Sequence, residues 1–288
     1  MEIIIYGLCE SFVILLFALG FHLVFGLGGV VHLSYGAFAI GGAYAIGIFY
    51  WRLGWAPPLA ILVGIALVTL LVFIFYKFLL SRTQGLMINE ALISLAVLLI
   101  IMDVIMLTCG TAPVPFPNVW PERLVPLFGT QFELSRLGVI IIAPLICLGI
   151  WWFLKHTTGG RGMWALSADR EVAMLMGVAP VKLITYMIVI ATIVSMVGAF
   201  LSLSFLGLSP VIGELIILWV LFAVILGGVG SFKGMVLASF IIGFSEAITA
   251  SMLGSELKLL APLVIILLII VFRPSGIFGV ATKLEERL

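Results

Sequence analysis

The sequence Leu-Gly-Gly-Val occurs twice, at residues 27–30 and again at residues 226–229, and each copy interrupts a long apolar run. Paired glycines release backbone groups from the helical hydrogen-bond ladder and let chain segments approach closely. Unwound backbone within a membrane is tolerated where it is buried in protein or lines a water-filled path. Broken spans at corresponding positions of two repeats are typical of a translocation route. The two breaks therefore predict a solute path, and close packing of helices through small residues is the alternative.

Polar side chains cluster beside the first break and recur inside later apolar runs. A histidine, a serine and a tyrosine follow the first glycine pair. Glu246 lies within an apolar run, where an ionisable side chain is costly and usually functional. The predicted path residues are Gly28, Gly29, His32, Ser34, Tyr35, Gly227, Gly228 and Glu246.

Four further polar residues, Glu10, Asp103, His22 and Glu214, lie in or near apolar runs. Glu214 follows a Ser-Pro pair and is expected to begin a helix. Glu10, like Glu246, either pairs with a neighbouring helix or faces a cavity, and Asp103 is expected close to the outer surface.

The ionisable residues form no metal-binding or nucleotide-binding motif. The sequence has no HExxH, no Cys/His cluster, no calcium-binding loop and no Walker lysine motif. The three cysteines lack CxxC spacing, which is typical of small buried hydrophobic residues. No nucleophile and base have the spacing that a catalytic triad needs. We therefore expect no enzyme activity, cofactor or metal in this chain.

The elements that position these residues must lie in lipid. The chain has 288 residues, of which 64% are hydrophobic and 9% charged, whereas about a quarter of a soluble domain is charged. This composition excludes a cytosolic enzyme, a secreted scaffold and a nucleic-acid binder, and a net charge of +1 gives no attraction to polyanions. The apolar runs are continuous rather than alternating, which favours helices over a barrel. The prediction is an all-α, polytopic transmembrane bundle that forms one domain over residues 1–288.

Nine apolar segments predict about eight to nine membrane spans, since some are short. They are residues 3–25, 35–50, 58–80, 91–109, 137–154, 183–206, 214–226, 235–252 and 259–272. With the C-terminus inside, ten basic residues lie inside and four outside, which places the N-terminus outside. Both glycine breaks then follow an outside-to-inside crossing, so the repeat is parallel.

Two connections are too long for simple turns. Residues 110–136 contain five prolines and are expected to form an external loop without helices. Residues 155–182 are expected inside, with short helices. Asp169 is placed to cap one of them, and Gly177 to end it. An apolar ridge at residues 172–176, with Val172, Ala173 and Met176 on one face, predicts a docking surface for a cytoplasmic partner.

Several stretches, in the same order along the chain, resemble branched-chain amino acid ABC-transporter permeases of the LivH type. The first runs from Ala-Leu-Gly-Phe-His-Leu-Val-Phe-Gly at residues 18–26 to Gly-Ala-Tyr at 42–44. The second contains Gly-Arg-Gly-Met-Trp-Ala at 160–165 and Asp-Arg-Glu-Val-Ala at 169–173. The third is Leu-Gly-Gly-Val-Gly-Ser at 226–231, followed by Phe-Arg-Pro-Ser-Gly-Ile-Phe-Gly at 272–279.

The resemblance implies an importer subunit in a bacterial or archaeal cytoplasmic membrane. Such a permease pairs with a second, LivM-type permease on two cytoplasmic ATPases, which bind ATP and Mg, and an external binding protein delivers the solute. The implied coupling residues are Arg161, Asp169, Arg170, Val172, Ala173, Met176 and Gly177.

The sequence departs from the family pattern at residues 32–36, at His22 and at Trp164. The first two departures leave the substrate open between branched-chain amino acids, other amino acids, urea and short amides. Pairing with a copy of itself also stays open. An ion-coupled secondary transporter is the alternative of another class, although it does not explain the ridge at residues 172–176.

Overall fold

A computed structural model describes residues 2–114, 124–127 and 130–279. Seven helices within these residues are long and apolar enough to cross a membrane. They are α1 (Glu2–Phe21) with the π-helix η1 (His22–Leu27), α3 (Pro57–Phe78) with the 3₁₀ turn η2 (Leu80–Arg82), α4 (Met87–Cys109), α5 (Leu134–His156), α8 (Pro180–Leu206), α10 (Phe232–Leu253), and the 3₁₀ turn η3 (Ser255–Leu257) with α11 (Leu260–Phe272). The predicted polytopic helical bundle is confirmed.

Two shorter apolar helices complete the set of predicted spans. Helices α2 (Tyr35–Trp51) and α9 (Val211–Gly227) have 17 residues each, the lower limit of about 17 to 25 residues for a crossing. Each of the nine predicted segments coincides with a helix in the described part of the chain. Helix α9 begins at Val211, before Glu214, and the exposed Glu214 lies in its first turn.

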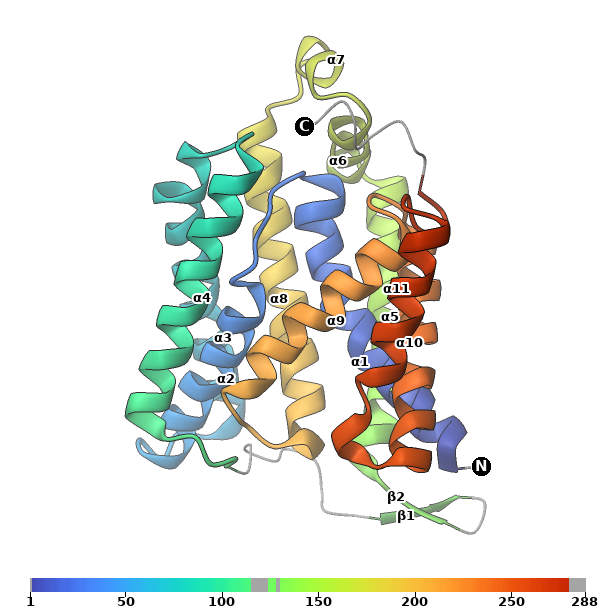
Figure 1. Ribbon diagram of the computed structural model, residues 1–288. Coiled ribbons are helices and arrows are strands. Elements are labelled where there is room, and N and C mark those ends of the chain that lie inside the picture. Colours follow the sequence, from blue (N-terminus) through green and yellow to red (C-terminus); the bar gives the residue numbers. More distant parts are fainter. Residues whose placement is uncertain (1, 115–123, 128–129, 280–288) are drawn as a thin grey trace.

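The bundle has two distinct ends (Figure 1). Helix α1 begins at the end that carries the two β-strands, and α11 runs to the opposite end, where α6 (Thr158–Ala168) and α7 (Arg170–Leu175) lie. Helices α1 and α9 run in the same direction, so both glycine breaks lie at the end of α6 and α7. This agrees with a parallel arrangement of the two breaks.

Burial separates an inner set of helices from an outer set. The most apolar 18-residue windows of α1 and α8 are each 61% buried, whereas those of α4 and α5 are each 22% buried. Outer helices expose large apolar side chains such as Leu99, Leu145 and Leu267. A helix that is apolar on all sides requires a lipid environment when protein does not cover it. The chain is therefore a multi-pass membrane protein.

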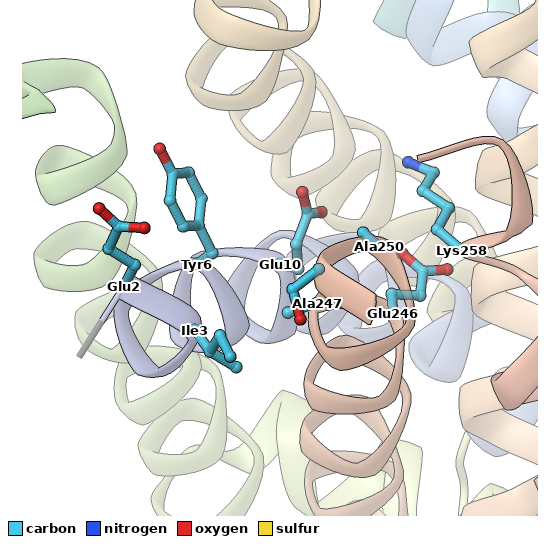
Figure 2. Close-up of a pocket in the computed structure, with 9 residues that line it drawn as sticks. Glu2, Ile3, Tyr6, Glu10, Glu246, Ala247, Ala250 and Lys258 are labelled. Carbon is cyan, nitrogen blue, oxygen red and sulfur yellow. The ribbon is translucent and has the colours of Figure 1, made fainter. Parts of the chain in front are cut away.

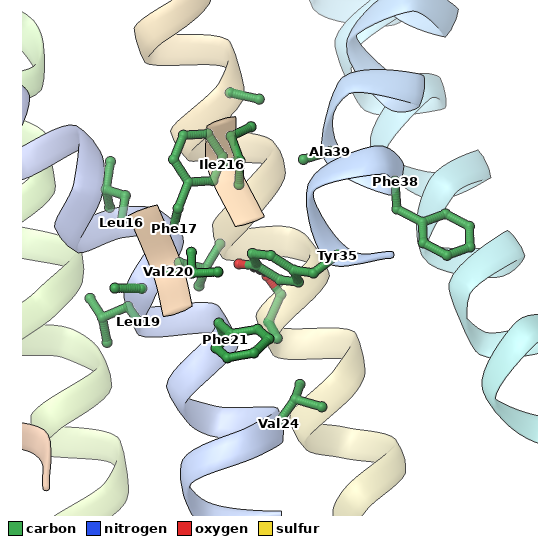
Figure 3. Packing of buried hydrophobic residues seen from close by; sticks show 14 of the residues in the cluster. Leu16, Phe17, Leu19, Phe21, Val24, Tyr35, Phe38, Ala39, Ile216 and Val220 are labelled. Atoms are coloured by element: carbon green, nitrogen blue, oxygen red, sulfur yellow. Dashed lines mark hydrogen bonds between the residues drawn. The ribbon is translucent and has the colours of Figure 1, made fainter. Parts of the chain in front are cut away.

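The core forms where α1 meets α2 and α9 (Figure 3). Phe17 and Phe21 of α1 pack beside Tyr35 of α2 and Ile216 of α9, and all four side chains are almost fully buried. The rings of Phe21 and Tyr35 are 6.0 Å apart and nearly perpendicular, a favourable arrangement for aromatic pairs. This packing fixes the start of α2 against the middle of the bundle.

The expected external loop differs from the prediction in one respect. It contains an antiparallel hairpin of β1 (Leu124–Leu127) and β2 (Thr130–Glu133), and α5 begins at Leu134 rather than after residue 136. Phe132 is buried and packs 5.8 Å from the Tyr6 ring, so it attaches the hairpin to α1. Three of the five prolines lie in residues 115–123, outside the described residues.

Candidate functional site

The first glycine break follows a distorted helix end. Helix α1 continues into the π-helix η1, and Gly29 has φ 68°, which favours glycine. Residues 28–34 are not helical, and α2 begins at Tyr35. In Figure 1 this connection runs from the end of the bundle back toward its middle before α2 starts. The break therefore places unwound backbone inside the protein, as the sequence predicted.

Two α4 side chains hold this unwound segment. The Glu90 carboxylate accepts hydrogen bonds from the backbone N–H of Val31 at 2.9 Å and of Gly85 at 3.0 Å. The hydroxyl of Ser94 accepts one from the N–H of Leu33 at 3.1 Å. Glu90 and Ser94 are fully buried. They satisfy backbone donors that would otherwise be costly to bury.

Glu90 and Ser94 were not among the predicted residues. The available signal was an acidic residue at the start of a long apolar run, with a serine four positions later on the same face. Their partners lie about sixty positions earlier in the sequence, so their contacts are not visible in local patterns.

His32, Ser34 and Tyr35 lie together, as expected, but in packed protein. Each is at most 2% exposed. The Ser34 hydroxyl lies 3.0 Å from Nδ1 of His32, whose ring packs against Phe38 and Phe75. The Tyr35 hydroxyl donates to the backbone oxygen of Ala191 on α8 at 3.3 Å. These contacts join the start of α2 to its neighbours, and a role in a solute path stays a prediction.

A cavity of about 290 Å³ lies beside the first break. Gly28, Gly29, Gly85 and Arg170 line it, together with four apolar side chains. The guanidinium of Arg170 also donates to the side-chain oxygen of Gln84 at 3.3 Å. The cavity thus connects the unwound segment to the first residue of α7.

The second break makes different contacts. The carbonyls of Leu226 and Gly227, at the end of α9, accept hydrogen bonds from the N–H groups of Ile277 and Phe278 at 2.8 and 3.1 Å. A side chain at Gly228, where φ is 95°, would overlap the backbone of Gly279. These are contacts of close packing, the alternative that the sequence left open. A solute path at Gly227 and Gly228 stays a prediction.

The predicted coupling segment forms two short helices. The Asp169 carboxylate accepts from the N–H groups of Glu171 and Val172 at 2.9 and 3.0 Å, and Gly177 follows α7 with φ 84°. The predicted cap and the predicted helix end are confirmed. Arg161 lies on α6 at a cavity of about 450 Å³ that Lys155, Trp164 and Lys233 also line.

The predicted face of the apolar ridge at residues 172–176 is wrong at Ala173. Ala173 is 3% exposed and faces inward, so it does not share a surface with Val172 and Met176. Val172, Leu175 and Met176 are 54%, 87% and 81% exposed. Ala173 is buried on the inner side of α7, whereas the larger apolar side chains point outward. The exposed ridge is therefore Val172, Met174, Leu175 and Met176.

Glu246 lies at the other end of the bundle. It lines a cavity of about 270 Å³ between α1 and α10, together with Glu10 and Lys258 (Figure 2). The predicted path residues therefore do not meet in one place. Gly28 and Gly29 line one cavity, Glu246 lines another, and residues 13–24 of α1 and η1 between them are buried.

This geometry defines a class of protein: a multi-pass membrane bundle with broken helices, a cavity near each end, and an apolar ridge projecting from one end. The chain belongs to the family described as the permease component of the branched-chain amino acid transport system, whose family model matches residues 3–272. The predicted family is confirmed, and it is a family of transport components rather than enzymes.

Two curated relatives have similar lengths. The high-affinity branched-chain amino acid transport system permease protein BraD of Pseudomonas aeruginosa is 23% identical, over 95% of this chain and 94% of its own. The permease protein LivH of the corresponding system in Escherichia coli is 24% identical, over 92% of this chain and 90% of its own.

A solved structure shows the same fold. The structure described as PsaBC from Streptococcus pneumoniae in complex with Fab has a chain that matches with a TM-score of 0.55 and 16% identity. The match covers 96% of this chain and 94% of that chain. At this identity the likeness concerns the fold alone.

Proposed function

We propose that this chain is the membrane-spanning subunit of an ABC importer, and that partner ATPases drive it. The observation that carries the proposal is the exposed ridge on α7. Leu175, the last residue of α7, and Met176, which follows it, are more than four-fifths exposed, and α7 projects beyond the bundle (Figure 1). On a segment outside the lipid-facing bundle, a contiguous exposed apolar patch bordered by polar residues is typical of an interaction site. The family match supports an ATPase as the partner at this interface.

Arg170 supplies a physical route from that interface to the interior. It begins α7, contacts Gln84 in the connection between α3 and α4, and lines the cavity at Gly28 and Gly29. Movement of α7 would change this cavity directly. In this mechanism the ATPases bind ATP and Mg, and this chain contributes the moving helix α7 and the solute path.

The proposed solute is a small polar molecule, with branched-chain amino acids first. The names of the two curated relatives support this choice, and urea or a short amide is the alternative within the family. An external binding protein delivers the solute, and the second permease is a LivM-type chain. The membrane is the bacterial or archaeal cytoplasmic membrane, with α6, α7 and the C-terminus inside and the N-terminus outside.

The substitution Leu175→Asp tests the docking surface. Leu175 is 87% exposed, so a charge there leaves the fold intact but opposes burial against an apolar partner surface. Met252→Asp is the matched control, because Met252 is 78% exposed and is the second-last residue of α10, a helix that ends at the opposite end of the bundle (Figure 1). Under mild extraction, we expect an ATPase to co-purify with the wild type and with Met252→Asp but not with Leu175→Asp. Equal recovery with all three proteins would contradict the assignment of α7.

A further inference from the structure

The cavity between α1 and α10 contains ionisable groups from three separate segments. Glu2 and Glu10 come from α1, Glu246 from α10, and Lys258 from the turn before α11 (Figure 2). Ile3, Tyr6 and Ala250 add apolar surface to the wall. The volume of about 270 Å³ is near the lower limit of about 300 Å³ for small-molecule pockets. The cavity therefore suits a small ligand with charged and apolar parts.

Glu10 and Glu246 each present a carboxylate oxygen that lacks a hydrogen-bond partner among the described residues. Glu246 is 1% exposed, and its Oε1 accepts a hydrogen bond from the indole N–H of Trp219 at 2.7 Å. Its Oε2 is buried and unpartnered among the described residues, and so is Oε2 of Glu10. The Trp219 bond fixes the orientation of the Glu246 carboxylate and leaves one oxygen free. A buried carboxylate oxygen without a donor is costly, and a ligand with N–H groups would satisfy it.

The nearby cations do not neutralise this pair. Arg136 forms an ion pair with Glu133 at 3.3 Å and stacks on the Tyr6 and Phe205 rings. The Lys258 ammonium lies 5.4 Å from the centre of the Trp219 ring, and in the described part of the chain it forms no ion pair with Glu10 or Glu246. The cavity thus offers the two acceptor carboxylates of Glu10 and Glu246, the exposed carboxylate of Glu2 and one separate donor ammonium.

This combination fits a zwitterion better than a metal ion. Among the residues that the structure describes, no group of three His, Cys, Asp or Glu side chains is arranged to hold a metal, and a lysine ammonium beside the site repels a cation. An amino acid carries an ammonium group and a carboxylate on one carbon. The two carboxylates can accept from its ammonium, and Lys258 can donate to its carboxylate through charge-assisted hydrogen bonds.

We propose that this cavity binds the zwitterionic head group of an amino acid, with Glu10 and Glu246 holding its ammonium and Lys258 its carboxylate. The proposal rests on the proposed function, because it assigns the solute-binding site of that importer. The apolar wall at Ile3, Tyr6 and Ala250 receives the aliphatic side chain of the solute. The site lies at the end of the bundle away from α7, where solute enters from outside.

Binding of radiolabelled leucine to the purified membrane complex, free of the external binding protein, tests this site directly. Glu246→Gln keeps an oxygen acceptor for Trp219, and Glu10→Gln disturbs no hydrogen bond described for the protein. Each loses one charge that would face the ammonium, so we expect each to weaken leucine binding by about tenfold or more. Glu256→Gln is the matched control, because Glu256 is exposed on η3 near the same end and does not line the cavity.

Lys258→Gln provides a readout that a purely structural role would not change. The wild type is expected to prefer leucine over leucinamide, which lacks the carboxylate charge. In Lys258→Gln the ratio of the leucine affinity to the leucinamide affinity should fall. The leucine carboxylate loses its ionic partner, whereas leucinamide has no carboxylate that could use one. An unchanged preference would overturn the assignment of Lys258.

The outcomes separate this site from the proposed function. If the complex imports leucine with ATP but both carboxylate variants bind leucine as the wild type does, the site assignment is wrong and the importer stands. Absence of leucine binding to a wild-type complex that imports it would overturn the site assignment in the same way. If no ATPase co-purifies with the wild type, the proposed function itself fails.

Discussion

Glu90 helps to hold the backbone of the first glycine break in place. Its carboxylate accepts two backbone N–H groups, from Val31 and from Gly85, which belong to different connections. It therefore joins the unwound segment after η1 to the turn before α4. One end of this link, Gly85, lines the cavity of Gly28 and Gly29.

Glu90→Gln is expected to lower the free energy of unfolding by about 1.5–3 kcal/mol, the usual contribution of a hydrogen bond to a charged group. An amide has one acceptor oxygen, so one of the two N–H groups would face an NH₂ donor instead. The midpoint of thermal unfolding in detergent measures the effect. Glu256→Gln, at an exposed carboxylate, should leave the midpoint unchanged. Equal midpoints for both variants would contradict the role given to Glu90.

At the scale of the elements, the end of α9 depends on a contact with the C-terminal segment. The N–H groups of Ile277 and Phe278 bind the last carbonyls of α9, and Gly228 lies against Gly279. The carbonyls at the end of a helix otherwise have no partner. This contact therefore completes α9 and fixes the connection to α10.

Gly228→Ala and Gly254→Ala form a matched pair that measures this packing. Their φ angles are 95° and 98°, so both substitutions introduce a similar backbone strain of about 1–3 kcal/mol. A new Cβ at Gly254 would have no atom within 4 Å, whereas one at Gly228 would overlap Gly279. We expect Gly228→Ala to lower the unfolding midpoint further, by an extra ~1–3 kcal/mol of overpacking. Equal losses would show that the contact with Gly279 does not stabilise the protein.

Local signals in the sequence predicted the elements well. Runs of about 20 apolar residues mark the spans because the membrane core sets their length. The cap at Asp169 and the helix end at Gly177 are likewise encoded within a few residues. Contacts between distant segments were not predictable in this way. The hydrogen bonds from Val31 to Glu90 and from Ile277 to Leu226, and the inward face of Ala173, depend on how the helices pack.

At the scale of the whole molecule, the two cavities lie near opposite ends of one bundle. Between them, residues 13–24 of α1 and η1 are buried, and α1 packs against α8, α9 and α10. Figure 3 shows part of this packing, where Phe17 and Phe21 lie beside Tyr35 and Ile216. A solute bound at Glu246 therefore meets packed side chains before it can reach Gly28. Transport requires these helices to rearrange, and the energy for this step enters through α7 in the proposed mechanism.

The most direct test of the importer is leucine uptake into proteoliposomes that contain this chain, its co-purified partners and the binding protein. We predict uptake that requires ATP on the α7 side, persists when ion gradients are collapsed, and is lost in Leu175→Asp but retained in Met252→Asp. Uptake that follows an ion gradient without ATP, and that Leu175→Asp leaves unchanged, would contradict the importer mechanism and indicate a secondary transporter.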